Sequence, residues 1–193
     1  RDNLQIIPNA ASIENLAREV KDNGGVYIVP AFSGLFAPYW RPDARGVIVG
    51  LTRFANRKHL ARAVLESTAY QTRDVADAMV ADSGVEITEL RVDGGMTMNE
   101  LLMQFQSDIL GVEVHRPKNI ETTATGAAFA AGLDHGFWDD LSVLGSQTGD
   151  MKVFKPKRDK EEVEGLYRDW KRAIKRSLEW EDNEDEDLNL SLI

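Results

Sequence analysis

The sequence predicts an α/β domain whose mixed sheet is flanked by helices. Short runs of β-branched and aromatic residues alternate with longer segments in which apolar residues recur at helical spacing. The chain has 193 residues, of which 42% are apolar and 28% charged, so it is long enough for one domain with a substantial core. The longest apolar run, 124–133, is far shorter than the ~20 residues of a membrane-spanning helix.

The first third of the chain predicts a helix, a strand and a loop. Residues 12–22 have apolar residues at helical spacing, with Ser12 as a candidate N-cap and Gly24 as a stop. Residues 25–31 form a β-rich run and predict a strand. Glycine and prolines among aromatic residues predict an ordered loop over 32–45.

The middle of the chain predicts two further strands and two helices. Residues 46–51 predict a strand, and residues 56–82 predict a long helix that ends at Ser83-Gly84. A third strand is expected over 87–92, and a helix over 98–110.

The last third predicts a strand, two helices and a tail. We expect a strand over 112–116, a helix rich in small residues over 122–135 and an amphipathic helix over 159–180. The predicted domain therefore covers 1–180, and residues 181–193 form an acidic tail that is expected to be disordered. Carboxylates disfavour the C-terminal end of a helix, so the tail is not expected to extend it.

Composition excludes several classes of function. The chain has no cysteine, which excludes disulfides and thiolate chemistry and fits a cytoplasmic location. The net charge is −9, and seven acids with no Lys or Arg lie within 179–193, so no broad basic surface for nucleic acid is indicated.

Basic residues between Lys152 and Arg176 are interpreted as a helix surface that complements the tail, with polyanion binding as the alternative. No signal peptide is recognised, and a start at Arg1 suggests a fragment or a processed chain.

The strongest local feature is the turn Asp93-Gly94-Gly95 between a predicted strand and a predicted helix. Glycines permit positive φ and let a ligand approach the backbone, and N–H groups at a helix start attract anions or polar heterocycles. Asn99 is placed on the first helical turn, where its amide both donates and accepts. A nucleotide-binding wall and a plain strand–turn–helix connection both fit this pattern, which is neither G-x-G-x-x-G nor a Walker A motif.

Other candidate sites carry weaker signals. The aromatic and proline-rich segment 30–46 fits either an active-site loop or a rigid packed loop. No metal-ligand spacing relates His59, His115 and His135, and no nucleophile motif surrounds Ser33 or Ser67. The carboxylates Glu66, Asp74 and Asp77 fit a solvated helix face. Thr122 or Thr123, after Glu121, fits a helix cap.

From about residue 23 to 180 the chain resembles the C-terminal half of the FGGY carbohydrate kinases. The second signature of that family, a glycine-rich strand followed by a short helical block, matches Gly46, Ile48, Gly50, Leu51, His59, Leu60 and Ala63 to Glu66. The resemblance implies the actin-like, ribonuclease-H-like ATPase fold without its first strands. Blocks 29–34, 37–40, 65–74, 102–108 and 136–138 resemble the glycerol kinase branch more than the pentulose kinases.

The resemblance implies MgATP-dependent phosphorylation of glycerol to sn-glycerol 3-phosphate. It assigns nucleotide contacts to Gly95 and Asn99, with Gly94 as their neighbour, and so favours the nucleotide wall over the plain turn. It places the general base, the β-phosphate hairpin and the glycerol site upstream of this chain. No catalytic or metal-binding residue is therefore assigned within the chain, and the piece alone is expected to be inactive. Homo-oligomers are possible.

Departures from the family are Phe36, Arg41 and Thr125, and the segment 156–160 lacks the pattern that binds a regulatory protein in some bacterial relatives. The alternatives are another FGGY sugar or polyol kinase, and a non-catalytic actin-like module that binds a nucleotide.

Overall fold

The computed structural model describes residues 5–142 and 150–181, which fall into two compact units. The first unit combines the described residues up to Val85 with those from Arg158 onward, and the second spans Glu86 to Lys157. The predicted acidic tail lies outside the described residues, apart from Glu181.

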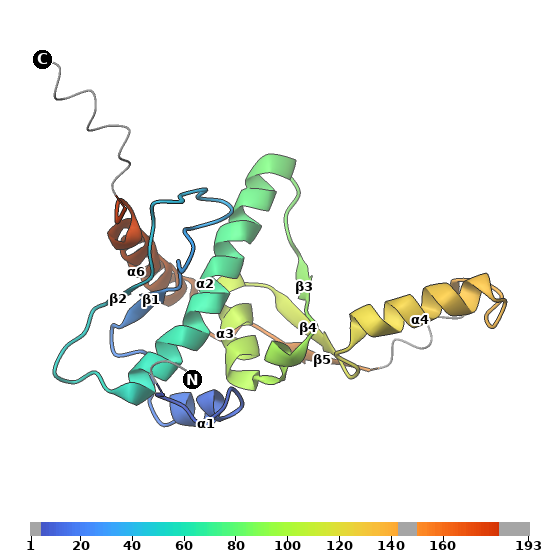
Figure 1. Cartoon of the computed structure of the whole chain (residues 1–193), viewed down its shortest axis with the longest axis horizontal. Coiled ribbons are helices and arrows are strands. Elements are labelled where there is room, and N and C mark those ends of the chain that lie inside the picture. The colour runs from blue at the N-terminus through green and yellow to red at the C-terminus, as the bar shows by residue number, and fades with distance from the viewer. Residues whose placement is uncertain (1–4, 143–149, 182–193) are drawn as a thin grey trace, which may run out of the picture. The chain divides into compact units, whose positions relative to one another are not determined.

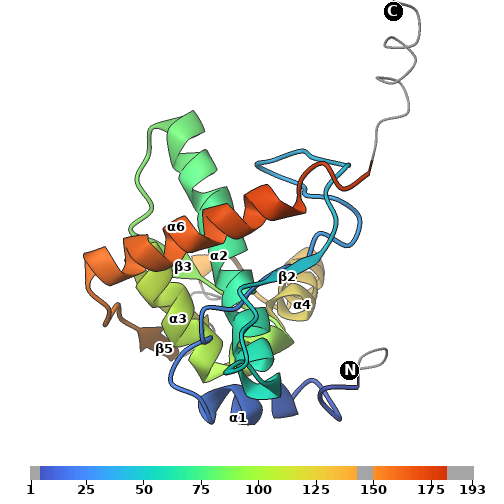
Figure 2. The ribbon, with the colours of Figure 1, turned by 90° about the vertical axis from the view of Figure 1, so that its left-hand side faces the viewer.

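The first unit packs three helices around a two-stranded antiparallel sheet. Its elements are α1 (Ser12–Arg18), β1 (Tyr27–Val29), β2 (Val47–Val49), α2 (Arg57–Ser83) and α6 (Lys160–Ser177). The strands pair with Ile28 opposite Ile48, and β1 contacts both α2 and α6. Figure 2 shows α6 crossing the long α2.

The long helix α2 ends where the sequence predicts, and it begins with a cap that was not predicted. Asn56 forms a capping box with His59, and Gly84 ends the helix in the left-handed conformation at φ 69°. Its buried face places Tyr70 against Trp170 of α6, with the rings stacked 5.3 Å apart. This aromatic pair lies in the core of the first unit.

The first helix differs from its prediction at both ends. Ser12 is not the N-cap: Ala11 holds that position without a side-chain cap, and Asn9 Oδ1 accepts from the Ser12 amide at 3.0 Å. The helix ends at Arg18, and Gly24 lies in the following turn at φ +62°. Added bulk at Gly24 would meet the His59 ring at 2.7 Å, so close packing and positive φ both favour glycine there.

The second unit contains a three-stranded sheet; the sheet is mixed, as predicted, but only two of its strands were predicted. Its elements are β3 (Glu89–Arg91), a 3-10 helix η1 (Gly95–Met98), α3 (Glu100–Leu110), β4 (Glu113–Pro117), α4 (Thr122–Asp134) and β5 (Met151–Phe154). β4 is the central strand: it pairs parallel with β3 and antiparallel with β5. The strand β5 was not predicted from the sequence.

The small-residue helix α4 extends away from the sheet of its own unit (Figure 1). None of its side chains is buried, although most are apolar. Within the described residues, no helix is long and apolar enough to cross a membrane.

Candidate functional site

The glycine turn after β3 forms as the sequence predicts. Val92 extends the strand by donating to His115 O at 3.0 Å, and Gly94 then adopts φ 84° and ψ 166°. That conformation is essentially restricted to glycine. A Cβ built on Gly94 or Gly95 would meet nothing within 4 Å, so open space lies beside the backbone of both residues. A flat ligand can therefore approach this backbone closely.

The turn is held by hydrogen bonds on both sides. Gly94 N donates to Ile120 O at 2.9 Å, and Thr97 donates to Gly94 O from its amide at 3.1 Å and from its hydroxyl at 2.7 Å. Thr97 is buried, whereas Gly95 is exposed. The exposed part of the turn is thus supported by a buried threonine.

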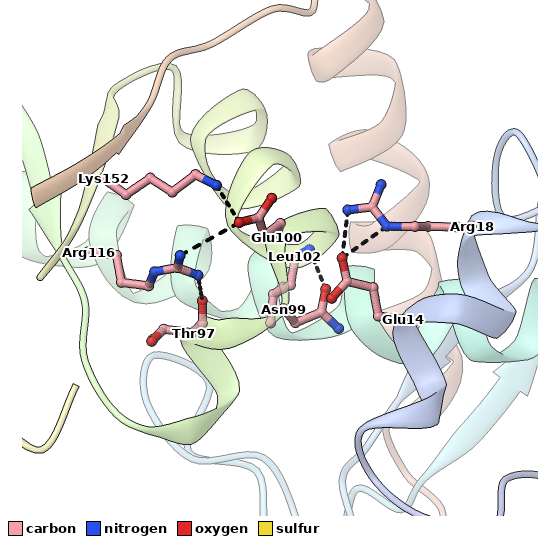
Figure 3. A network of polar contacts seen from close by, with 8 residues as sticks. All are labelled: Glu14, Arg18, Thr97, Asn99, Glu100, Leu102, Arg116 and Lys152. Carbon is pink, nitrogen blue, oxygen red and sulfur yellow. Dashed lines mark hydrogen bonds and ion pairs between the residues drawn. The ribbon is translucent and has the colours of Figure 1, made fainter. Parts of the chain in front are cut away.

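Asn99 was expected on the first turn of α3. It is instead the N-cap, one position before the helix begins. Its Oδ1 accepts from Leu102 N at 2.9 Å (Figure 3). Within the described residues its Nδ2 has no hydrogen-bond partner, and the side chain is half-buried. The capping oxygen fixes the amide, which leaves two N–H donors for a ligand.

The Glu121 segment also differs from expectation. Glu121 is the N-cap of α4 without a side-chain cap bond, so neither threonine caps the helix. Instead, the Thr122 hydroxyl donates to the Asp93 carboxylate. The start of α4 is therefore tied to the residue that precedes the two glycines.

A cavity of about 450 Å³ adjoins the turn at Asp93. Its size suits a small ligand. Gly94, Gly95 and Asn99 do not line it, so it is separate from the open space beside the glycines. The lining residues come from β3, β4, β5, α4 and the turns that follow β3 and β4: Arg91, Val92, Asp93, His115, Pro117, Asn119, Thr122, Thr125, Gly126, Phe129 and Met151.

Two carboxylates of α2 are buried, so the expectation of a solvated face is wrong for them. Asp74 accepts from Tyr167 Oη at 2.6 Å, Trp170 Nε1 at 2.7 Å and Lys171 Nζ at 3.1 Å. Glu66 accepts from Arg62 Nε at 2.6 Å and from Asn23. Burial raises the pKa of Glu66, and the Arg62 charge opposes that shift. Asp77 is exposed, as expected.

One part of the aromatic loop 30–46 is packed, and another part is exposed to solvent. Leu35 and Arg41 exchange backbone hydrogen bonds at 2.8 Å across it, and Tyr39 Oη accepts from Lys171 Nζ at 2.7 Å. Phe32, Phe36 and Trp40 remain largely exposed. A cavity of about 350 Å³ lies between the loop and Asp74 within the first unit.

The histidines and serines have structural partners or lie at the surface. His59 Nδ1 accepts from Asn56 N, His115 faces Glu113 and Glu89, and Ser67 donates to Val64 O. His135 ends α4, and Ser33 is exposed. Among the residues that the structure describes, no cluster of three potential ligands could hold a metal ion.

The basic residues from 152 onward do not form one helix surface, because Lys152 lies on β5. Lys152 pairs with Glu100, Lys155 with Glu113 and Lys171 with Asp74. These cations therefore balance carboxylates within the described units.

The family model for the C-terminal domain of the FGGY family of carbohydrate kinases matches residues 4–134. A glycerol kinase of Corynebacterium kroppenstedtii is 69% identical over 96% of this chain, and one of Pseudarthrobacter chlorophenolicus is 64% identical over 95%. The chain spans only 36% of the length of each of these relatives.

Solved structures agree in fold. The glycerol kinase of Plasmodium falciparum with ADP superimposes with a TM-score of 0.82 at 37% identity, over 91% of this chain and 35% of that one. A xylulose kinase of Lactobacillus acidophilus gives 0.71 at 24% identity, over 90% and 36%, which supports the fold alone. The described sheet and helices are thus those of the actin-like C-terminal domain, and the chain belongs to the FGGY family of carbohydrate kinases.

Proposed function

We propose that this chain is the C-terminal part of an ATP-dependent glycerol kinase and forms the adenosine-side wall of its nucleotide site. The carrying observation is the identity of 60–69% to glycerol kinases along nearly the whole chain. The glycine turn supports it, because open space at Gly94 and Gly95 and free N–H donors at Asn99 suit a nucleoside.

In this proposal the chain's own residues bind and orient the nucleotide. The paired glycines let the adenosine lie against the backbone, and Asn99 Nδ2 donates to one of its acceptors. The buried Thr97 holds the turn in place, so little ordering is needed on binding. Correct placement of ATP matters because phosphoryl transfer depends largely on positioning and on neutralising charge.

Mg²⁺, when bound with the phosphates, would offset their charge during transfer to a glycerol hydroxyl. We propose that the metal enters with ATP. The base that accepts the hydroxyl proton and the contacts to glycerol are proposed to lie in the remaining length of the protein. An activity that consumes ATP also leads us to propose a cytoplasmic location.

The activity test uses the full-length protein with MgATP and a panel of polyols and sugars. Release of ADP that depends on glycerol supports the proposal. Release with a pentulose or gluconate instead would move the protein to another branch of the family. Binding of ATP without turnover of any substrate would favour a non-catalytic module. The 193-residue piece alone is expected to release no ADP above a buffer control.

The site test compares Asn99→Ala with Asn99→Ser. Loss of one hydrogen bond costs about 1–3 kcal/mol, or roughly a 5- to 150-fold loss of ATP affinity. Serine is a good N-cap but lacks the amide N–H donors, so Asn99→Ser should lose ATP affinity while keeping the stability of α3. Glycerol affinity should change little in both variants. Unchanged ATP affinity in Asn99→Ser would remove the amide from the site.

A further inference from the structure

A buried arginine from a neighbouring strand reaches the candidate nucleotide turn. Arg116 lies on β4, and its side chain is only 11% exposed. Its Nη1 donates to Thr97 O at 2.7 Å (Figure 3). Thr97 stands between Gly95 and Asn99, so this bond fixes the backbone midway between the two proposed nucleotide contacts.

The guanidinium is itself held in place by charge. Glu100 Oε1 lies 3.7 Å from Arg116 Nη2, and the same oxygen accepts from Lys152 Nζ of the adjacent strand (Figure 3). Arg116 and Lys152 are register partners in the sheet, and the ring of Phe154 lies 5.6 Å from the guanidinium carbon. One carboxylate at the start of α3 thus orients two cations of the sheet.

We propose that Arg116 is a positioning residue that holds the Gly94–Asn99 turn in its nucleotide-binding shape. This inference rests on the proposed function, because it assumes that the turn binds ATP. Thr97 uses its amide and hydroxyl within the turn, and Arg116 takes its carbonyl. The turn is thereby fixed to β4 before any ligand arrives.

The geometry needs an arginine in particular. The guanidinium presents several donors in one rigid plane, so one edge can reach the carbonyl while another faces Glu100. A lysine at the same position offers one ammonium on a flexible stem, which can satisfy either partner but not both in this arrangement. Substitution by lysine should therefore preserve the charge and restore only part of the positioning.

The variants Arg116→Met and Arg116→Lys in the full-length protein test this role. Arg116→Met should raise KM for ATP about tenfold, the effect expected for loss of one charge-assisted hydrogen bond, and leave KM for glycerol and kcat within about twofold. Arg116→Lys should fall between Arg116→Met and the parent protein. Lys155→Met is the matched control, because it removes an exposed cation that pairs with Glu113, a residue on the same strand as Arg116. It should leave all three constants unchanged.

Hydrogen exchange supplies a readout that does not depend on turnover. In Arg116→Met the amides from Gly95 to Leu102 should exchange faster, while those of α2 should not change. If Arg116→Met does not fold, Arg116→Lys and Glu100→Gln carry the same comparison. Equal losses of ATP and glycerol affinity, or unchanged KM for ATP, would overturn the positioning role. A parent protein that neither binds nor uses ATP would instead overturn the proposed function.

Discussion

Asp74 offers a quantitative test of how the first unit is held together. Its carboxylate is 1% exposed, and it accepts from one donor on each of Tyr167, Trp170 and Lys171. All three donors lie on α6, whereas Asp74 lies on α2. Asp74→Ala removes the single acceptor that joins these helices through three bonds.

The expected loss in the free energy of unfolding follows from the burial of each donor. Trp170 is fully buried, so its indole N–H would lose a charged acceptor and gain no water in exchange. A hydrogen bond to a charged group contributes about 1.5–3 kcal/mol, and the half-buried Tyr167 adds a second bond of this kind. Lys171 contributes least, because its side chain is 43% exposed and can be hydrated. We therefore expect Asp74→Ala to lower the free energy of unfolding by about 3–5 kcal/mol.

Urea unfolding followed by tryptophan fluorescence measures this loss. The NMR cross-peak of the Trp170 indole N–H should also shift strongly. Asp77→Ala is the control: Asp77 lies one helical turn further along α2, is exposed and faces Arg73 at 3.5 Å. It should cost less than about 1 kcal/mol. If Asp74→Ala costs no more than Asp77→Ala, the three bonds do not stabilise the unit as argued.

Three other predictions follow from pKa shifts and backbone geometry. Burial raises the pKa of all four tyrosines, that of Tyr27 to about 12. The absorbance of the folded chain should therefore show no tyrosinate near pH 10, and its stability should fall as the pH rises above 10. Normal tyrosine titration of the folded chain would refute this. Arg41 and the Glu179 amide hold the pKa of Asp43 well below its usual range, so its stabilisation persists above about pH 4 and is lost only below it. Acid unfolding of Asp43→Asn should lack that pH dependence. Gly94→Ala should destabilise the second unit by about 1–3 kcal/mol in thermal unfolding, whereas Gly95→Ala should leave stability unchanged and weaken ATP binding.

Elements with strong local signals were predictable from the sequence. The periodicity of α2, with Asn56 before it and Gly84 after it, contains all that defines that helix. The glycine turn was likewise predictable, because a strand, two glycines and a helix follow one another within a few residues. By contrast, β5 was missed, because it forms by pairing with β4, which lies far away in the sequence. Ser12 failed as a cap because Asn9 and Ala11 form the turn before α1.

Long-range polar partners explain the other errors. Glu66 and Asp74 have the charges of a solvated face, and composition cannot show that Arg62, Tyr167 and Trp170 supply donors to them inside the unit. Polarity predicts exposure only when no such donor approaches. The same reasoning applies to Thr122, whose hydroxyl finds Asp93 rather than its own helix.

The role proposed for Arg116 shows why a support for the proposed binding turn is harder to predict than the turn itself. Glycines and an asparagine announce a turn because the local backbone needs those residue types. An arginine on a strand follows no such pattern, and its role depends on β4 lying parallel to β3, which brings it beside Thr97 from 19 positions away. Its burial then requires a counter-charge, which Glu100 provides at the start of α3. The residues proposed to face the ligand could therefore be predicted from the sequence, whereas the residue proposed to hold them in shape could be identified only from the assembled sheet.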